Sequence, residues 1–289
     1  MQLQMRGWDR LMGLNARNEL IARHNPPTAV RLVNDKFATK SALAAAGVRT
    51  APTVQVLSSR RALARLDWAA IPDAFAVKPN QGLGGSGILL TAARLDPVTW
   101  TSASGRRIPL LQLKDHIRLI FDGEFSPRPR DVALLEPLLV PHPSMAALTF
   151  QGLPDVRVIC LGSRPVIAML RLPTAASGGR ANLHQGAIGA AVELETGRVS
   201  RAWLSGRRVT EHPDTGSVLV GATVPEWSSV LHLARQCAGA TGLHYLGADV
   251  VIDAERGPLV LEVNARPGLQ IQNVTGQGLL DVVEAEVVA

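Results

Sequence analysis

The chain has 289 residues, 46% of them hydrophobic, with 26 glycines and 19 prolines. This composition allows a sizeable core and favours a mixed α/β chain with many turns over a helical bundle. The formal net charge is +6, but the basic residues are scattered and no aromatic stacking platform accompanies them, so we expect no nucleic-acid partner. A solvated surface is the simplest interpretation of this charge, and a small anionic substrate would also suit it.

The two cysteines, Cys160 and Cys237, lack the spacing of metal ligands or of a C-x-x-C motif, and they indicate a reducing intracellular compartment. The N-terminal residues lack the long apolar stretch of a signal peptide. No run approaches the roughly 18 apolar residues of a membrane-spanning helix. We therefore expect a cytoplasmic protein without membrane insertion.

The elements alternate irregularly along the chain. Residues 1–33 are polar with short apolar groups, and residues 101–129 show no clear pattern. Periodicity and end signals predict helices at 35–47, 58–68 and 225–242, and strands at 48–57, 75–79, 87–91, 155–162, 164–173, the end of 176–194 and twice within 247–268, with a further apolar run at 132–140. Strands outnumber helices and several form hairpins, so we expect α+β sheets flanked by helices rather than a doubly wound parallel sheet.

The glycine-rich stretch FAVKPNQGLGGSGILL (75–90) satisfies G-x-G-x-x-G at Gly82, Gly84 and Gly87. A dinucleotide-binding loop would need a helix afterwards, but a strand-like segment follows. A P-loop would need lysine where Ile88 stands. A protein-kinase loop has its lysine after the glycines, and the chain contains neither H-R-D nor D-F-G.

The remaining pattern is strand, loop and strand, with Lys78 ahead of the glycines. Lys78 would then point at phosphates that the loop covers, because glycine lets backbone N–H groups approach oxygen closely. A plain hairpin with a flexible tip is the alternative.

Acidic residues mark two strands further on. Asp249 lies in the first, and Glu262 and Asn264 lie two apart in the second, so they face the same way. A carboxylate in so apolar a strand is costly without a partner. A magnesium ion would offset that cost, since it prefers oxygen ligands of these kinds. An ion pair between Glu262 and Arg266 is the alternative.

These residues occur in the order Lys36, Lys78, glycine loop, Asp249, Glu262-x-Asn264, and in this the chain resembles ATP-grasp enzymes. DKFATKSALAAAGVRTAPT resembles the opening of the ATP-grasp module, and LEVNARPGL its magnesium strand. SGGRANLHQGA is similar to the alpha-L-glutamate ligases that modify ribosomal protein, and GLNARN and MLRLPT to ligase-like proteins related to them.

The resemblance implies an ATP-grasp fold, in which two α+β subdomains grip ATP between antiparallel sheets. The implied boundaries are a short N-terminal segment at 1–34, a small subdomain with the glycine loop at 35–135, and a C-terminal subdomain with the magnesium site at 136–289. Relatives usually carry a whole N-terminal domain before the first lysine, whereas 35 residues precede Lys36 here. A homo-oligomer or a partner protein could supply the missing surface.

The resemblance also implies roles for individual residues. ATP would be held by the phosphate-contacting Lys36 and Lys78, by a loop made of Gln81, Gly82, Gly84, Gly85, Ser86 and Gly87, and by Glu136 at the adenine hinge. One or two Mg²⁺ ions, or Mn²⁺, would be held by Asp249, Glu262 and Asn264. The catalytic residues would be Arg157 in a D-x-R pattern with Asp155, Arg171, Asn182 near the transferring phosphate, and Arg266, which would face the acceptor with Gly268. Alternatively, Arg157 and Arg171 are surface arginines of strands, and His184 packs on the sheet.

The implied activity is ATP-dependent ligation of a carboxylate to an amine through an acyl phosphate. The substrates would be a carboxylate and an amino acid such as glutamate. A phosphotransferase acting on a hydroxyl and a non-catalytic nucleotide-binding subunit are the two alternatives.

Overall fold

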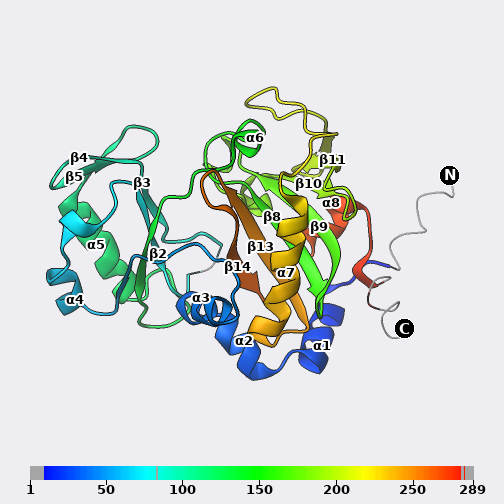
Figure 1. Ribbon diagram of the computed structural model, residues 1–289, viewed down its shortest axis with the longest axis horizontal. Coiled ribbons are helices and arrows are strands. Elements are labelled where there is room, and N and C mark those ends of the chain that lie inside the picture. The colour runs from blue at the N-terminus through cyan, green and yellow to red at the C-terminus, as the bar shows by residue number, and fades with distance from the viewer. Residues whose placement is uncertain (1–9, 83, 281–282, 284–289) are drawn as a thin grey trace. The chain divides into compact units, whose positions relative to one another are not determined.

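The computed structural model describes residues 10–82, 84–280 and 283. Their contacts divide the chain into two units. The first takes its residues from 1–34, 38–50 and 140–289, and the second from 35–37 and 51–139. The first unit therefore joins the blue N-terminal helices of Figure 1 to the green-to-red second half of the chain.

The first unit is built on a seven-stranded antiparallel sheet with the order β12–β11–β10–β9–β8–β13–β14. Two long hairpins form its centre and one edge, because tight turns join β8 to β9 and β13 to β14. The strands are β8 (Asp155–Leu161), β9 (Arg164–Leu172), β10 (Ile188–Val192), β11 (Val199–Leu204), β12 (Arg207–Val209), β13 (Tyr245–Asp253) and β14 (Gly257–Asn264).

Helix α7 (Trp227–Thr241) covers one face of this sheet. Figure 1 shows it lying along β8, β13 and β14. Its apolar side chains pack against Val156, Leu170 and Val250, and α2 (Pro27–Val33) and α3 (Lys36–Ala45) extend the same core. Gly242 ends the helix in the left-handed conformation that glycine adopts readily.

The opposite face is only partly covered by apolar side chains. Helices α1 (Leu14–His24) and α8 (Gln270–Thr275) pack there against residues such as Ile159, Ile167 and Tyr245. Strand alternation places Asp155, Arg157 and Asp249 on this same face. The remaining short elements of the unit are α6 (Pro143–Ala146) and the 3₁₀ turn η2 (Leu183–Gln185).

A β-bulge in β14 decides which face its polar residues occupy. Asp249 pairs with Glu262 but Val250 pairs with Val260, so Leu261 is an extra residue. Regular pairing would place Glu262 opposite Ala248, whose side chain lies in the core beneath α7. The bulge instead turns Glu262 and Asn264 toward the face of Asp249.

The second unit contains a four-stranded antiparallel sheet of order β1–β7–β2–β3 and a three-stranded one of order β4–β5–β6. Its core gathers Trp68, Phe75 and Trp100 with the buried side of α5. The elements are β1 (Gln55–Leu57), α4 (Arg60–Ala64), η1 (Trp68–Ala70), β2 (Phe75–Pro79), β3 (Leu89–Thr91), β4 (Ala93–Asp96), β5 (Thr99–Thr101), β6 (Arg107–Pro109), α5 (Leu110–Phe121) and β7 (Ala133–Pro137).

Most of the predicted elements are present. The helices at 35–47 and 225–242 and both long hairpins are confirmed. The strand predicted over 48–57 is wrong for most of its length, since only 55–57 form a strand, and Thr50 adds an isolated bridge to Val260. The helix predicted at 58–68 is confirmed only over α4, which Ser59 caps by accepting a hydrogen bond from the Ala62 N–H.

Candidate functional site

Lys78 and Glu136 form a buried ion pair in the second unit. Phe75 and Val77 of β2 point into the core, so Lys78 projects from the other side of the strand. Its Nζ lies 2.6 Å from Oε2 of Glu136 on the neighbouring β7, and their side chains are 16% and 3% exposed. The structure therefore brings together two of the residues predicted to hold ATP.

Lys36 also reaches the glycine loop, the segment 81–87. Its Nζ donates a hydrogen bond of 2.6 Å to the carbonyl oxygen of Gly82. The adjacent N–H of Phe37 donates to Oδ1 of Asn80 at 2.8 Å. The start of α3 is thus held against the start of the loop.

The two ends of the glycine loop are fixed by side chains. At one end, Oδ2 of Asp131 accepts a hydrogen bond of 2.9 Å from the Gln81 N–H. At the other end, Nε2 of His116 lies 2.8 Å from the carbonyl oxygen of Gly87. Gly84, Gly85 and Gly87 have φ values of 60°, 80° and 72°, a region where side chains are strained.

Four charged residues of the first unit form one cluster on the sheet face opposite α7. We call Asp155, Arg157, Arg171 and Asp249 the charged cluster. Arg157 holds Asp249 with Nε and Nη2 at 2.7 and 2.6 Å. Arg171 holds Asp155 at 2.5 and 2.7 Å and also reaches Asp249 at 2.8 Å.

The surroundings of Asp249 and Asp155 shift the pKa values of these two carboxylates in opposite directions. Burial acts to raise the pKa of Asp249, but Arg157 and Arg171 outweigh it and hold that pKa below its ordinary value of 3.8. Burial raises the pKa of Asp155 to about 6, against the opposing charge of Arg171. Asp249 is therefore the carboxylate held ionised, which is the form that binds a cation.

The predicted metal ligands lie beside this cluster. Glu262 is the cross-strand neighbour of Asp249, and Nδ2 of Asn264 lies 3.3 Å from Oδ2 of Asp249. Two carboxylates and an amide suit magnesium chemically. Both oxygens of Asp249 already accept hydrogen bonds from arginines, so a cation there would share them with guanidinium groups. Among the described residues, no group of three His, Cys, Asp or Glu side chains could hold a metal ion.

Asn182 and Arg266 have no hydrogen bond to the charged cluster among the contacts of the described residues. Asn182 caps η2, since its Oδ1 accepts from the His184 N–H at 3.0 Å. Arg266 is exposed. Pro267 follows it and packs against Gly247, and the next residue, Gly268, lies beside Arg157.

A hollow of about 510 Å³ opens beside Gly268. Met12, Arg17, His184 and Leu269 are among the residues that line it. Arg17 donates to the carbonyl oxygen of Pro267 at 3.4 Å, and its buried Nε has no hydrogen-bond partner in the part of the chain that the structure describes. The hollow is therefore positively charged at one wall and apolar at another.

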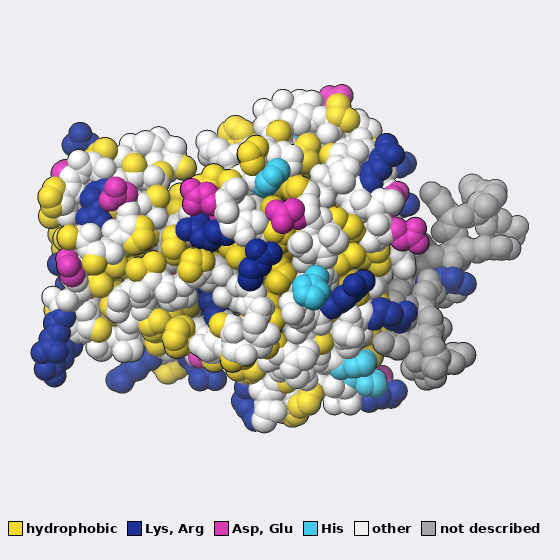
Figure 2. All heavy atoms as spheres, viewed as in Figure 1, with side chains coloured by type: hydrophobic (Ala, Val, Ile, Leu, Met, Phe, Trp, Pro, Cys, Tyr) yellow, Lys and Arg dark blue, Asp and Glu magenta, His cyan; other side chains and the backbone are white. Residues whose placement is uncertain are grey.

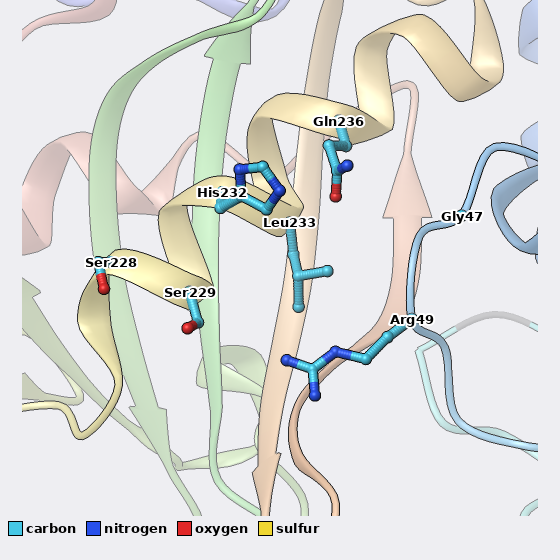
Figure 3. A pocket seen from close by; sticks show the side chains of 7 residues that line it. All are labelled: Gly47, Arg49, Ser228, Ser229, His232, Leu233 and Gln236. Carbon is cyan, nitrogen blue, oxygen red and sulfur yellow. The ribbon is translucent and has the colours of Figure 1, made fainter.

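A second hollow, of about 490 Å³, lies on α7. Figure 3 shows Ser228, His232 and Gln236 on successive turns of the helix, with Arg49 facing them from another segment. Because α7 covers the sheet face opposite the charged cluster, this hollow lies on the other side of the sheet. Ser228, His232 and Arg49 are exposed, so we give this hollow no part in the candidate site.

Several residues of the site were not predicted as such. The D-x-R pattern includes Asp155 but does not indicate its contact with Arg171. No sequence pattern points to Asp131, His116 or Arg17. Their partners are backbone atoms or residues distant in sequence, and no local spacing signals such contacts.

The comparison with protein families decides the identity of the fold. Residues 15–286 match the model described as "Sugar-transfer associated ATP-grasp". The chain belongs to this ATP-grasp family. The predicted α+β ATP-grasp fold and the resemblance to ATP-grasp enzymes are thereby confirmed.

Known relatives of this ATP-grasp chain include a probable alpha-L-glutamate ligase of Parasynechococcus marenigrum (strain WH8102), 33% identical over 135 residues. That match covers 46% of this chain, which spans only 22% of the relative. Solved structures that this chain matches include ATP-grasp ligase PsnB with a minimal precursor (17% identity, TM-score 0.49, 91% of this chain and 64% of that one). D-Alanine–D-alanine ligase from Bacillus anthracis has 14% identity and a TM-score of 0.49, over 94% and 70% of the two chains.

Figure 2 shows one face of this ATP-grasp chain, and the charged side chains of the described residues are dispersed over that face. On the visible face, Lys and Arg side chains lie at many separate points among polar and apolar ones. Among the residues that the structure describes, no helix has the length and apolar character needed to cross a bilayer.

Proposed function

We propose that the protein is an ATP-dependent carboxylate–amine ligase. The observation that carries this proposal is the charged cluster, with Glu262 and Asn264 beside it, in a chain of the ATP-grasp family. The guanidinium groups of Arg157 and Arg171 and the ionised carboxylate of Asp249 lie on one sheet face, and they suit a reaction that transfers a highly charged phosphoryl group. The relative named as a probable glutamate ligase supports an amino acid such as glutamate as one substrate.

The proposed chemistry has two steps. A substrate carboxylate oxygen attacks the γ-phosphorus of ATP, the bond to the β-phosphate oxygen breaks, and ADP leaves. The amine nitrogen then attacks the acyl carbon, the bond from that carbon to the phosphate oxygen breaks, and the amine loses a proton. Inorganic phosphate and an amide are the products.

Each unit contributes residues to this proposal. Lys36, Lys78 and the glycine loop bind the phosphates of ATP, and the backbone near Glu136 binds adenine. Arg157 and Arg171 offset the charge that spreads over the transferring phosphoryl group. Closure of the glycine loop keeps water from the acyl phosphate.

Asp249, Glu262 and Asn264 hold one or two Mg²⁺ ions in this proposal, and Mn²⁺ suits the same oxygen ligands. The metal supplies positive charge against the phosphate oxygens. The amine substrate binds beside Gly268, where Arg266 faces it and the hollow next to Arg17 offers a positive wall. Asn182 lies near the transferring phosphate. We also propose a cytoplasmic location.

Hydroxylamine trapping tests the reaction class. ADP release is measured with Mg²⁺ over a panel of amino acids, with amino sugars among the amines because the family model is named for sugar transfer. Hydroxylamine converts an acyl phosphate to a hydroxamate. A hydroxamate that depends on one acid supports the ligase, whereas ADP release with a stable phosphorylated alcohol and no hydroxamate would indicate a phosphotransferase.

Replacing a metal ligand tests the site. Glu262→Gln keeps the size of the side chain but removes its charge, so turnover is expected to vanish while the melting temperature stays near that of the wild type. Glu255→Gln is the matched control, because Glu255 lies in the β13–β14 turn with a side chain that is 82% exposed. A Glu262→Gln variant as active as this control would refute the magnesium assignment.

A further inference from the structure

His116 of α5 contacts the last residue of the glycine loop. Its Nε2 lies 2.8 Å from the carbonyl oxygen of Gly87. A carbonyl oxygen can only accept, so Nε2 carries the proton and donates. Burial lowers the pKa of His116 below its ordinary value of 6.5, which leaves the ring neutral with this tautomer near pH 7.

Phe125 completes the contact from the segment after α5. Its ring centroid lies 5.2 Å from that of His116. A Cβ atom added to Gly87 would overlap the Phe125 side chain, and the φ of Gly87 is +72°. Gly87 is therefore required twice, once for its backbone conformation and once for the room that Phe125 occupies.

The first residues of the loop are held in a comparable way. Asp131 accepts from the N–H of Gln81 at 2.9 Å, and Lys36 donates to the carbonyl oxygen of Gly82 at 2.6 Å. Both ends of the loop are thus bound to side chains from other segments of the second unit.

We propose that His116 is a positioning residue, which with Phe125 anchors the far end of the glycine loop and so sets how the loop meets the phosphates of a bound nucleotide. The anchoring itself requires only the contacts above. Its effect on nucleotides rests on the proposed function, since it needs the loop to bind phosphate. His116 does not contact the reacting atoms.

Hydrogen–deuterium exchange on the ligand-free protein tests the anchor without any assumption about activity. His116→Leu is expected to raise exchange at least tenfold at the amides of Gly87 and Ile88. His116→Gln is expected to restore most of the protection, because a glutamine Nε2 can occupy a place similar to that of the histidine Nε2. The control is His232→Leu, the same substitution at an exposed histidine of α7. Unchanged exchange in His116→Leu would overturn the proposal.

Calorimetric titration with two probes tests the effect on the nucleotide. ADP carries phosphates and adenosine carries none. His116→Leu is therefore expected to weaken the binding of ADP about tenfold, or about 1.4 kcal/mol, and to leave the affinity for adenosine unchanged. Equal losses for both probes would indicate general damage and would overturn the positioning role. If the wild type binds ADP but forms no hydroxamate, the ligase proposal fails while the anchor stands.

Discussion

Arg171 contacts two carboxylates at once, and this makes the charged cluster a unit rather than two separate ion pairs. Its guanidinium donates to both oxygens of Asp155 and to one oxygen of Asp249. Burial acts to lower the pKa of Arg171, but the charges of Asp155 and Asp249 outweigh it and raise that pKa above its ordinary value. Any ligand that draws Arg171 away from Asp249 must therefore supply negative charge of its own, as a phosphate would.

The Lys78–Glu136 pair gives a prediction about single residues. Lys78→Met removes the ammonium beside a carboxylate that is 3% exposed, and breaking a buried pair costs about 3–5 kcal/mol of unfolding free energy. We expect the double variant Lys78→Met with Glu136→Leu to recover most of that stability, because the charge left behind is removed. Urea unfolding of both variants measures this.

The same two variants separate stability from nucleotide binding. If Lys78 binds phosphate, the double variant is stable but still binds ADP weakly in a calorimetric titration. Wild-type ADP affinity in the double variant would remove Lys78 from the proposed nucleotide site and leave it a structural role.

For single residues, sequence patterns point to candidate site residues more readily than to the residues that they contact. A lysine ahead of glycines is a local pattern that predicts a role for Lys78, and a carboxylate in an apolar strand does the same for Asp249; both roles stay predictions. The contact between Asp155 and Arg171 depends on the register of β8 against β9, which no short motif encodes. The assignment of the metal ligands stays a prediction.

Among the elements, the β13–β14 hairpin depends on one buried carboxylate. Asp253 is 1% exposed and accepts hydrogen bonds from the backbone N–H groups of Val140, Glu255 and Arg256. Burial acts to raise its pKa, but these donors and the charge of Arg256 outweigh that effect and lower it.

The lowered pKa gives a prediction with a definite sign. A carboxylate whose pKa is lower in the folded than in the unfolded state stabilises the fold when the pH is above its pKa in the unfolded chain, about 3.9. This stabilisation is lost as the pH falls through the pKa of the folded state. Asp253→Asn is expected to cost about 2 kcal/mol at pH 7 and to flatten the loss of stability below pH 4. Urea unfolding from pH 7 to pH 3 measures both, and an equally steep acid loss in the variant would contradict the prediction.

Element types were easier to predict than the way elements pair. Helix α7 has both of its end signals and a long apolar period, and it was found. Helices α1 and α2 were not predicted, because their apolar groups are too short to show a helical period. Ile21 and Val33 are recognisable as core residues only from their packing in the folded first unit. The bulge at Leu261 leaves no trace in composition, although it places Glu262.

For the whole molecule, the first unit includes both ends of the described chain. Asn25 shows this most clearly, since its side chain accepts from the N–H groups of His244 and Tyr245 and donates to the carbonyl oxygen of Tyr245. Met12 and Ile21 also contribute to the core beneath the charged face. The N-terminal segment is thus part of this unit's core.

Removing residues 1–34 is therefore expected to abolish cooperative unfolding of the remaining chain. The truncation deletes Met12, Ile21, Ala29 and Val33 from two cores, and each large apolar side chain lost from a core costs about 2–5 kcal/mol. Near-ultraviolet circular dichroism during heating measures the loss. The milder Asn25→Ala variant should still unfold cooperatively at a lower temperature, and a truncated chain that melts like the wild type would contradict this account.

The bulge at Leu261 has a consequence for how this hairpin can change in evolution. Side chains alternate between the two faces of a strand. Whether the number of residues between the turn and Glu262 is odd or even therefore decides which face Glu262 occupies. If the bulge is kept, deleting or inserting one residue there would exchange the polar side chains with Val263 and Ala265, whereas a change of two would preserve the arrangement. Gaps of even length should therefore be tolerated between Gly257 and Glu262 in related sequences, and gaps of odd length should occur only where the bulge is lost as well.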